Sequence, residues 1–409
     1  MLFRSRQVLD TSFMGMNRAS LPTQGLKILQ VVRVFHPSEG GMENFVKNLS
    51  FHLLEYGHHV DILTLNKGHG SNDELSEHST LEIMGQVINI FRVAASWYGP
   101  WFVPELSKIK LRDYDLIHIH GVDGFLEQLT GKKRNQFHAK VPIVLSTHGG
   151  FFHTTRWHLL KKIWFHTRIK EHLRHVNCVF ACSIQDAKLF AKVHDAISVI
   201  ENGVQIDDLF PGGMKKLDLN RLIFVGGFYE YKSIRDIVLF VEKMKIYNSA
   251  IHLELIGNGP LKGDVENLIH KRNLQNCIHL PGRVSRERLA SAYQEAGIFI
   301  SASRYEGFGL AIVEAMASGC LLLLNQIPAF EKFFKGTPGG ELVPFTNLED
   351  VISGYNRLCN LSLEARLEIS NANQEYSKKY SWSAVSEEFE RHYMAQLEEV
   401  TFPEPPGSL

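Results

Sequence analysis

The chain has 409 residues, which at roughly 150 residues per domain indicates two domains. Its 44 Lys+Arg balance 44 Asp+Glu, so the formal net charge is zero and electrostatic binding of nucleic acid is disfavoured. Apolar residues make up 44% and charged residues 22%, which indicates a folded globular protein and not a disordered one.

Cysteine content and hydropathy indicate a cytoplasmic protein. The five cysteines are few and odd in number, as expected of free thiols in a reducing compartment. No stretch reaches the roughly 18 consecutive apolar residues that a membrane-spanning helix needs. Residues 1–25 lack the continuous apolar core of a signal peptide. We expect them to form a disordered leader, with Met16 as an alternative start.

Residues 26–205 are predicted to form a doubly wound α/β domain. Short runs rich in Val, Ile and Leu recur there, each followed by a turn and a helical pattern, at residues 26–34, 60–65, 116–119, 143–146 and 179–182. Continuous apolar runs that alternate with helices indicate a parallel sheet buried on both faces.

Residues 206–380 show the same alternation of apolar runs and helical patterns and are predicted to form a second domain of the same kind. The apolar runs lie at residues 222–225, 253–256, 278–280, 298–301 and 321–324. Two tandem domains of this kind create a cleft, and their ligands bind beyond the carboxyl ends of the strands. Residues 381–400 are expected to form a helix that packs back on the domains, and residues 401–409 a disordered tail that contains three prolines.

The first candidate motif follows the first strand and opens a helix that is expected to run to about residue 56. Gly40 and Gly41 allow a phosphate or sugar to approach backbone N–H groups at the positively polarised helix start. A dinucleotide site would need G-x-G-x-x-G, which is absent. The alternative interpretation is that the two glycines only form a tight turn.

A second candidate follows the strand at 143–146. His148 is next to Gly149 and Gly150, and at a strand end it can hydrogen-bond a substrate hydroxyl, while Phe151 and Phe152 provide an apolar wall. The alternative is a structural histidine with satisfied hydrogen bonds.

The second domain carries two further motifs. Lys232 lies a few residues beyond Gly226 and Gly227, from where it can reach a diphosphate, although a solvated surface lysine is the alternative. The more specific motif spans residues 301–320, where Glu306 lies in a glycine-rich loop and Glu314 on the helix that follows. An anion held at the start of that helix would feel the helix dipole.

Metal and cofactor sites are not expected. Asp113 and Asp115 form a D-x-D pair that can bind a divalent cation. The pair precedes the strand at 116–119, so it lies at the wrong edge of the sheet and a surface turn is the better interpretation. Cys178 and Cys182 lack the second ligand pair of a zinc site.

Positive charge gathers between residues 131 and 175, which contain ten lysines and arginines and one acid. Trp157 and Trp164 alternate there with Lys161 and Lys162 at roughly helical spacing, as in a helix lying on anionic lipid. The alternative is a core-facing helix with a basic outer face.

Together these strings resemble the retaining glycosyltransferases of the GT-B fold that carry Glu, seven residues, Glu. The resemblance spans about residues 27–397, and its pieces arrive in the family's order: Gly40-Gly41, His118-x-His120-Gly121, Thr147-His148-Gly149, Ser183 with Asp186, Asn202-Gly203-Val204, Gly226 to Lys232, Gly257-x-Gly259-Pro260, Gly282-Arg283 and Glu306 to Glu314. The loop at 148–154 looks like that of α-mannosyltransferases that extend a lipid-diphosphate-linked oligosaccharide in bacterial exopolysaccharide assembly.

The resemblance implies two Rossmann-like domains that face a cleft, with a nucleotide sugar on the second and the acceptor on the first. By position, Lys232 would face the diphosphate, Glu306 the transferred sugar and Glu314 the ribose. The N–H groups of Phe308, Gly309 and Leu310 would lie near the phosphates, and His148 with the Gly40-Gly41 loop would close over sugar and diphosphate. One departure is Gly227, where the family usually has arginine; Arg304 or Arg283 would have to compensate, or donor binding is weakened.

The implied activity is transfer of a hexose, with mannose from GDP-mannose as the best match, to a lipid-linked or polysaccharide acceptor at the inner face of the cell membrane. A nucleotide-sugar epimerase and a catalytically impaired sugar-nucleotide-binding module are the alternatives. The first would turn over the donor without an acceptor. The second is suggested only by Gly227.

Overall fold

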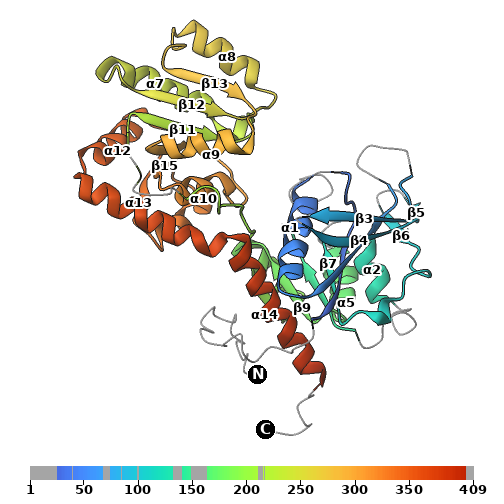
Figure 1. Cartoon of the computed structure of the whole chain (residues 1–409). Coiled ribbons are helices and arrows are strands. Elements are labelled where there is room, and N and C mark those ends of the chain that lie inside the picture. Colours follow the sequence, from blue (N-terminus) through green and yellow to red (C-terminus); the bar gives the residue numbers. More distant parts are fainter. Residues whose placement is uncertain are drawn as a thin grey trace. The chain divides into compact units, whose positions relative to one another are not determined.

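The computed structural model describes residues 25–38, 40–67, 74–83, 85–98, 101–131, 141–148, 164–210, 215 and 217–401. The chain divides into two compact units (Figure 1). Unit 1 comprises residues 1–203 and 382–409, and unit 2 comprises residues 204–381. The sequence places the corresponding boundaries at 205/206 and 380/381.

Unit 1 is built on an eight-stranded sheet with the strand order β10-β9-β8-β7-β1-β2-β4-β3. Its strands are β1 (Lys27–Val32), β2 (His59–Leu65), β3 (His78–Ile83), β4 (Gln86–Val93), β7 (Leu116–His120), β8 (Ile143–Ser146), β9 (Cys178–Ala181) and β10 (Ile197–Val199). All neighbouring strands are parallel except β3, which runs antiparallel to β4 at one edge. Every residue of β7, β8 and β9 is buried, as expected for strands covered on both faces.

Helices cover both faces of this sheet. They are α1 (Gly41–Glu55), α2 (Gly124–Thr130), a 3₁₀ turn (Leu111–Asp113), a π-helical turn (Phe165–Ile169) that leads into α5 (Lys170–Leu173), α6 (Ile184–Phe190) and α14 (Trp382–Thr401). Apolar side chains of α2, the π-helical turn and α5 form one core with the sheet. Those of α1 and α14 form the core on the other face.

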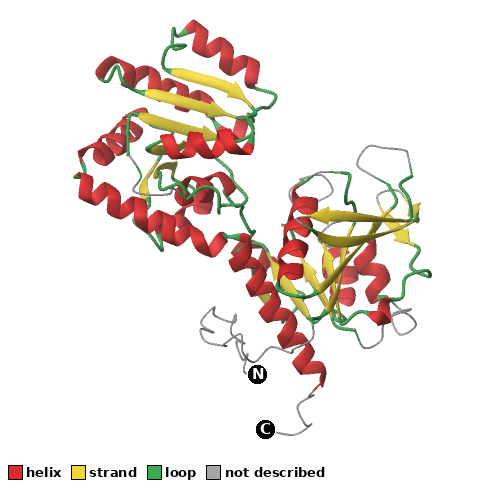
Figure 2. Cartoon of the chain, viewed as in Figure 1, coloured by secondary structure: helices red, strands yellow, loops and turns green. Residues whose placement is uncertain are grey.

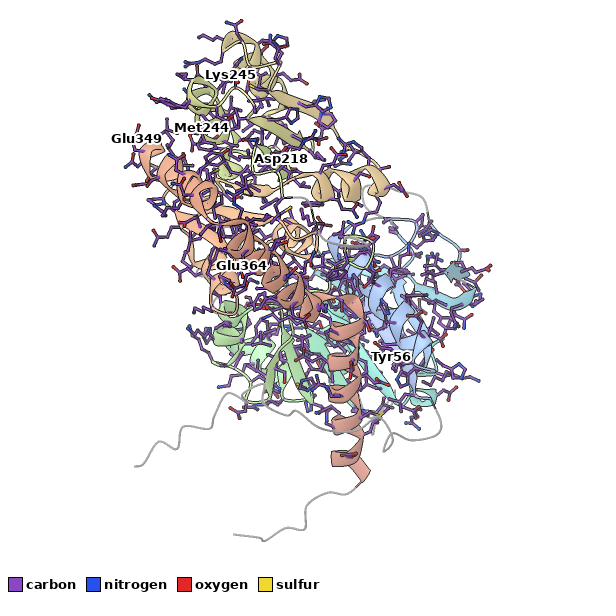
Figure 3. All side chains as sticks on the ribbon, turned by 60° about the vertical axis from the view of Figure 1, so that its left-hand side comes forward. Tyr56, Asp218, Met244, Lys245, Glu349 and Glu364 are labelled. Carbon is purple, nitrogen blue, oxygen red and sulfur yellow. The ribbon has the colours of Figure 1, made fainter. Side chains whose placement is uncertain are left out.

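The C-terminal helix α14 completes unit 1, although it follows unit 2 in the chain. It buries Trp382, Phe389 and Tyr393 against α1 and the sheet. The Tyr56 hydroxyl at the end of α1 donates to the carbonyl oxygen of Ser383 at 2.9 Å (Tyr56 is labelled in Figure 3). Unit 1 is therefore the surface on which the apolar stripe of this helix packs.

The expectation of an all-parallel first domain is wrong at one edge. The sequence analysis missed β3, β4 and β10, and also a separate two-stranded ribbon, β5 (Ala95–Tyr98) and β6 (Trp101–Pro104). Edge strands bury one face only, so β3 alternates between intermediate and exposed residues and has no continuous apolar run. A search for such runs therefore finds the central strands and overlooks the outer ones.

Unit 2 contains a six-stranded, fully parallel sheet with the order β13-β12-β11-β14-β15-β16. Strands are yellow and helices red in Figure 2. Its strands are β11 (Arg221–Val225), β12 (His252–Ile256), β13 (Ile278–Gly282), β14 (Ile298–Ser301), β15 (Leu321–Asn325) and β16 (Gly340–Val343). The first five coincide with the predicted apolar runs, and β16 was not predicted. The strand order reverses between β11 and β14, which makes this pair the topological switch point of the sheet.

The helices of unit 2 lie on both faces of its sheet and produce one core on each. They are α7 (Ile234–Tyr247), α8 (Lys262–Lys271), α9 (Arg286–Glu295), α10 (Leu310–Ala317), α11 (Pro328–Glu331), α12 (Leu348–Asn360) and α13 (Leu363–Ser377), with 3₁₀ turns at Glu230–Lys232, Lys332–Phe334 and Lys378–Tyr380. Among the described residues, no helix has the length and hydropathy that crossing a bilayer requires.

Candidate functional site

The switch point of unit 2 brings two predicted motifs together. The loop after β11 carries Lys232, and the loop after β14 carries Glu306. The backbone N–H of Arg304 donates to the carbonyl oxygen of Tyr231 at 2.7 Å and joins the two loops directly. Since β11 and β14 are parallel neighbours, both loops leave the same edge of the sheet, where ligands of such sheets bind.

Lys232 and Glu306 form an ion pair at this edge. The lysine Nζ donates to Oε2 of the glutamate, and the two side chains are only 13% and 20% exposed. Ser233, which follows the lysine, has a left-handed backbone (φ 49°) and is the N-cap of α7. The pair places a positive donor and a negative acceptor next to each other, a combination that can bind an anion and hydroxyl groups.

Backbone geometry at the start of α10 explains the glycine of this loop. Gly309 has φ 97°, in the left-handed region, and a Cβ there would approach Ile312 Cδ1 to 3.1 Å and Phe333 Cε2 to 3.3 Å. The first N–H groups of a helix have no acceptor within it, so the N-terminus of α10 presents donors and a positive dipole end. Phe308 is buried, and Leu310 is about half exposed.

Glu314, one turn further along α10, is held by two side chains of α9. Its Oε1 accepts a hydrogen bond from Arg286 Nη1 at 2.8 Å, and its Oε2 accepts one from the Tyr293 hydroxyl at 3.0 Å. Burial raises the pKa of this carboxyl, while the charge and hydrogen bond of Arg286 oppose the rise. The carboxylate of Glu314 is thus oriented and 16% exposed, with lone pairs left for hydroxyl donors.

The sequence analysis missed Arg286, because nothing in its local sequence distinguishes it from other helix-start arginines. It also binds both carboxylate oxygens of Asp208, each at 2.8 Å. Arg304, which was considered as a substitute for the arginine absent at 227, lies 3.4 Å from Asp236 and its side chain is 64% exposed.

Three exposed tyrosines lie in the same two loops as Lys232 and Glu306 and were not predicted either. Lys232 Nζ lies 5.6 Å from the ring centroid of one of them, Tyr231. The ring of Tyr229 stacks on Tyr231 with centroids 5.7 Å apart, and Tyr231 meets Tyr305 edge to face at 6.3 Å. A Cβ at Gly227 would lie 2.5 Å from Tyr229 Cε2. Tyr229 therefore occupies the space that a side chain at position 227 would need.

This packing predicts the effect of introducing the arginine that the sequence lacks. Gly227→Arg alone is expected to lower the free energy of unfolding of unit 2 by about 1–3 kcal/mol, because the Tyr229 ring must move. The double variant Gly227→Arg/Tyr229→Ala is expected to recover most of that loss. Thermal unfolding of both variants and of Tyr229→Ala tests this; an undiminished stability of Gly227→Arg would contradict the packing argument.

Unit 1 presents its own predicted residues at the carboxyl edge of its sheet. Gly40 is the N-cap of α1, and a Cβ on it would collide with the Glu43 carboxylate, while a Cβ on Gly41 would meet nothing. Glu43 is buried in the first turn, where its charge stabilises the helix start. A phosphate at this helix start would have to approach a carboxylate, which the sequence analysis did not anticipate.

His148 follows β8 with a left-handed backbone (φ 50°) and belongs to a chain of buried polar groups. Its Nε2 lies 2.9 Å from Nδ1 of His120, whose Nε2 lies 2.6 Å from Gln30 Oε1. If Gln30 Oε1 accepts, His120 carries its proton on Nε2, so Nδ1 accepts from His148 Nε2–H. This network leaves the lone pair of neutral His148 on Nδ1.

Burial keeps these histidines neutral. It lowers the pKa of His148 to about 4 and the pKa of His120 and His118 well below 6.5. The charges of neighbouring histidines lower the pKa of His120 and His118 further. His118 lies between the Ser146 hydroxyl at 2.8 Å and the Tyr393 hydroxyl at 2.6 Å. The position of His148 is thus fixed by a network that extends to α14.

This network predicts acid lability of unit 1. Because the three histidines bind protons more readily when unfolded, stability is complete above about pH 6.5 and falls as the pH drops toward 4. The maximum slope is about 1.4 kcal/mol per pH unit for each histidine. All five tryptophans lie in unit 1, so tryptophan fluorescence reports its unfolding alone. His118→Gln is expected to reduce the slope, and an unchanged slope would contradict this account.

Most of the residues predicted to contact the acceptor or the membrane lie outside the described residues, namely Phe151, Phe152, Trp157, Lys161 and Lys162. Trp164 is described, and its partly buried ring packs against the core of unit 1, which gives a lipid-facing role no support. The neighbouring Arg168 pairs with Glu127 at 2.7 Å, and Arg174 pairs with Glu171 at 2.8 Å.

One aspartate of the D-x-D pair has a structural role at the opposite edge of the sheet. Asp115 Oδ2 accepts a hydrogen bond from the backbone N–H of Lys27 at 2.8 Å, which fixes the start of β1. In the part of the chain that the structure describes, no group of three or more His, Cys, Asp or Glu side chains is arranged to hold a metal ion.

Comparison with known proteins identifies the family. Residues 206–376 match Glycosyl transferases group 1, and residues 39–208 match Glycosyltransferase Family 4. A GDP-mannose:cellobiosyl-diphosphopolyprenol alpha-mannosyltransferase of Xanthomonas oryzae pv. oryzae is 30% identical over 369 residues, which are 88% of this chain and 94% of that protein. The protein of the same name from Xanthomonas campestris is 29% identical over 381 residues, covering 91% and 97%.

Solved structures support the same fold. A glycosyltransferase from Rickettsia africae has a TM-score of 0.65 at 18% identity and covers 91% of this chain and 99% of its own. Sucrose-phosphate synthase from Thermosynechococcus elongatus has a TM-score of 0.63 at 19% identity, covering 91% and 99%. The predicted GT-B fold with two Rossmann-like domains is confirmed, and the chain is a glycosyltransferase that belongs to the group 1 family.

Proposed function

We propose that this protein is a retaining mannosyltransferase that moves mannose from GDP-mannose to a sugar linked to a lipid through a diphosphate. The observation that carries the proposal is the Lys232–Glu306 pair at the switch point of unit 2, beside the N-terminus of α10. Relatives named for this donor and a diphosphopolyprenol acceptor align with nearly the whole chain.

In this mechanism Lys232 turns from Glu306 to the diphosphate of the donor. Breaking the sugar–phosphate bond develops negative charge on the leaving diphosphate, and a preorganised cation stabilises it most. Backbone N–H groups of Phe308, Gly309 and Leu310 add the dipole of α10. Glu306, released from the lysine, accepts hydrogen bonds from hydroxyls of the mannose.

Glu314 is proposed to bind the ribose of the donor. Arg286 and Tyr293 hold its two oxygens in place, so the free lone pairs point in fixed directions. Ribose hydroxyls are neutral donors, and an oriented carboxylate binds them without a rearrangement of its partners.

Retention of configuration would follow from attack on the face that the diphosphate leaves. The acceptor hydroxyl forms the new bond to the anomeric carbon while the bond to the phosphate oxygen breaks, and that oxygen takes the acceptor's proton. A covalent intermediate on Glu306 is the less favoured route, because its carboxylate is paired with Lys232 and its proposed partners are hydroxyls.

For unit 1 we propose that neutral His148 and the Gly40-Gly41 loop contact the substrates. A histidine with its pKa lowered to about 4 stays neutral at physiological pH, so it offers a hydrogen bond to a hydroxyl without adding charge. A lipid-linked acceptor would bring the protein to the cytoplasmic face of the membrane as a peripheral protein.

Calorimetric titration with GDP-mannose, UDP-glucose and ADP-glucose tests the donor. We expect GDP-mannose to bind most tightly and to stabilise unit 2 by about 2.7 kcal/mol at a hundredfold excess over Kd. Tighter binding of a UDP- or ADP-sugar would contradict the assignment of the donor. Turnover of the nucleotide sugar without any acceptor would instead favour the epimerase.

A further inference from the structure

The ribbon formed by β5 and β6 exposes an unusual amount of apolar surface. Trp97 is 43% exposed, Tyr98 67%, Trp101 53% and Val103 44%, all within seven residues. Single exposed apolar side chains are common on protein surfaces, whereas a contiguous exposed apolar patch indicates a binding surface.

The strand register divides these side chains between two faces. Trp97 is paired with Phe102, whereas Tyr98 is paired with Trp101. Paired residues of antiparallel strands point to the same face, and neighbours along a strand point to opposite faces. Phe102 is buried and meets Phe125 of α2 with ring centroids 5.6 Å apart, so its face is the inner one. Tyr98, Trp101 and Val103 therefore form an open outer face.

An arginine lies on the inner face. The guanidinium carbon of Arg33 is 5.3 Å from the ring centroid of Trp97 and 5.4 Å from that of Phe102. The residue is exposed, and its guanidinium has neither an ion pair nor a hydrogen bond with any described residue. Stacking fixes the plane of a guanidinium and leaves its five N–H donors available to an anion.

One acid lies near this arginine. Asp123 caps α2 by accepting a hydrogen bond from the Phe125 N–H at 2.9 Å. Burial raises its pKa to about 7, while that hydrogen bond and the charge of Arg33 act in the opposite direction. Burial therefore disfavours the charged form of Asp123, the acid that would oppose the binding of an anion at Arg33.

All these groups lie at the carboxyl edge of the sheet. Arg33 directly follows β1, Asp123 follows β7, and the ribbon begins after β4. These three strands run in the same direction, because β1 is parallel to β7 and to β2, and β2 is parallel to β4. This is the edge at which sheets of this type bind their ligands.

We propose that Arg33 and the β5–β6 ribbon bind the polyprenyl diphosphate of the acceptor. Arg33 binds the diphosphate on the inner face of the ribbon, beside Trp97. The isoprenoid chain passes from there around the two-stranded ribbon to the outer face of Tyr98, Trp101 and Val103. The identity of this occupant rests on the proposed function, since the acceptors of the relatives are diphosphopolyprenols by name.

The chemistry of the site favours this ligand over a soluble sugar or a general membrane surface. A bidentate donor suits a diphosphate, and an aromatic and aliphatic face on the other side of the same narrow ribbon suits a long hydrocarbon chain. A free saccharide can stack on aromatic rings, but it carries no anionic group for Arg33. A phospholipid surface would call for several cations around the ribbon and not for one stacked arginine.

Direct binding to the whole protein tests this without any catalysis. The probes are farnesyl diphosphate, farnesol, inorganic diphosphate and neutral phospholipid vesicles, each titrated calorimetrically. We expect farnesyl diphosphate to bind at least tenfold more tightly than farnesol or inorganic diphosphate. Arg33→Ala and Trp101→Ser are each expected to weaken that binding about tenfold, and Arg33→Lys to recover part of the loss.

Tyr247→Ser is the matched control, because Tyr247 is a 71% exposed aromatic residue at the end of α7 in unit 2. It is expected to bind farnesyl diphosphate like the wild type. Three results would overturn the proposal. They are equal affinity for all three soluble probes, binding of farnesyl diphosphate that Arg33→Ala and Trp101→Ser leave unchanged, and equally tight binding of neutral phospholipid vesicles. No probe contains mannose or a nucleotide. This binding test therefore gives a clear result even if the proposed donor or the proposed transfer reaction is wrong.

Discussion

Lys232→Met is expected to lower kcat/KM for the nucleotide sugar by about 10²- to 10³-fold. The lysine side chain is 13% exposed at the switch point of unit 2, where its charge is weakly screened by water. Removing one preorganised donor from a developing anion costs a factor of this size in other enzymes. Methionine preserves the length and apolar stem of the side chain, so the change removes mainly the charge.

The same structure offers a matched control for this variant. Lys378 pairs with Glu375 in unit 2, and both side chains are more than half exposed. Exposed pairs of this kind contribute little, so Lys378→Met is expected to leave kcat/KM within about twofold. If Lys232→Met retained wild-type kcat/KM with an intact fold, the lysine would not contact the diphosphate.

Glu306→Gln is expected to reduce kcat by about 10²-fold and to leave measurable activity. Glutamine still accepts a hydrogen bond from a sugar hydroxyl, but without the charge that strengthens it. If Glu306 were instead a covalent nucleophile, its loss would cost on the order of 10⁶-fold, as removal of a nucleophile does elsewhere. Single-turnover kinetics distinguishes the two outcomes.

A double-mutant cycle of Lys232→Met and Glu306→Gln adds a second test. Because the two side chains are partners in the free protein, their effects on kcat/KM are expected not to add. The cycle of Lys378→Met and Glu375→Gln is the control, with effects that are small and additive. Additive large effects at Lys232 and Glu306 would mean that the two residues act independently.

The central strands could be predicted from the sequence because strands that are buried on both faces consist almost entirely of apolar residues. Strands such as β7, β8 and β15 are buried throughout and appear as continuous apolar runs. Strand β3 is half exposed and β5 is mostly exposed, so neither has such a run. Their partners are fixed by tertiary contacts that a local pattern does not contain.

The same limit applies to the candidate site. Glycine-rich loops that follow strands have a local signature, and this signature singled out Lys232, Glu306 and Glu314 as candidates. The hydrogen bond from Arg286 to Glu314 joins two residues on different helices, 28 positions apart in the chain, so no local sequence pattern predicts it. Tyr229 packs against Gly227 within one loop, but the direction of its ring depends on Tyr231, on which it stacks.

Nuclear magnetic resonance of the reaction product is the most direct test of the central claim, that this protein transfers mannose with retention. The purified protein is incubated with GDP-mannose, with and without a disaccharide diphosphate that carries a polyprenyl chain. We expect the protein to attach mannose to the acceptor in the α configuration and to consume GDP-mannose only when the acceptor is present. We expect Lys232→Met to form this product at a much lower rate. A β-linked product, or consumption of GDP-mannose that does not depend on the acceptor, would contradict the account.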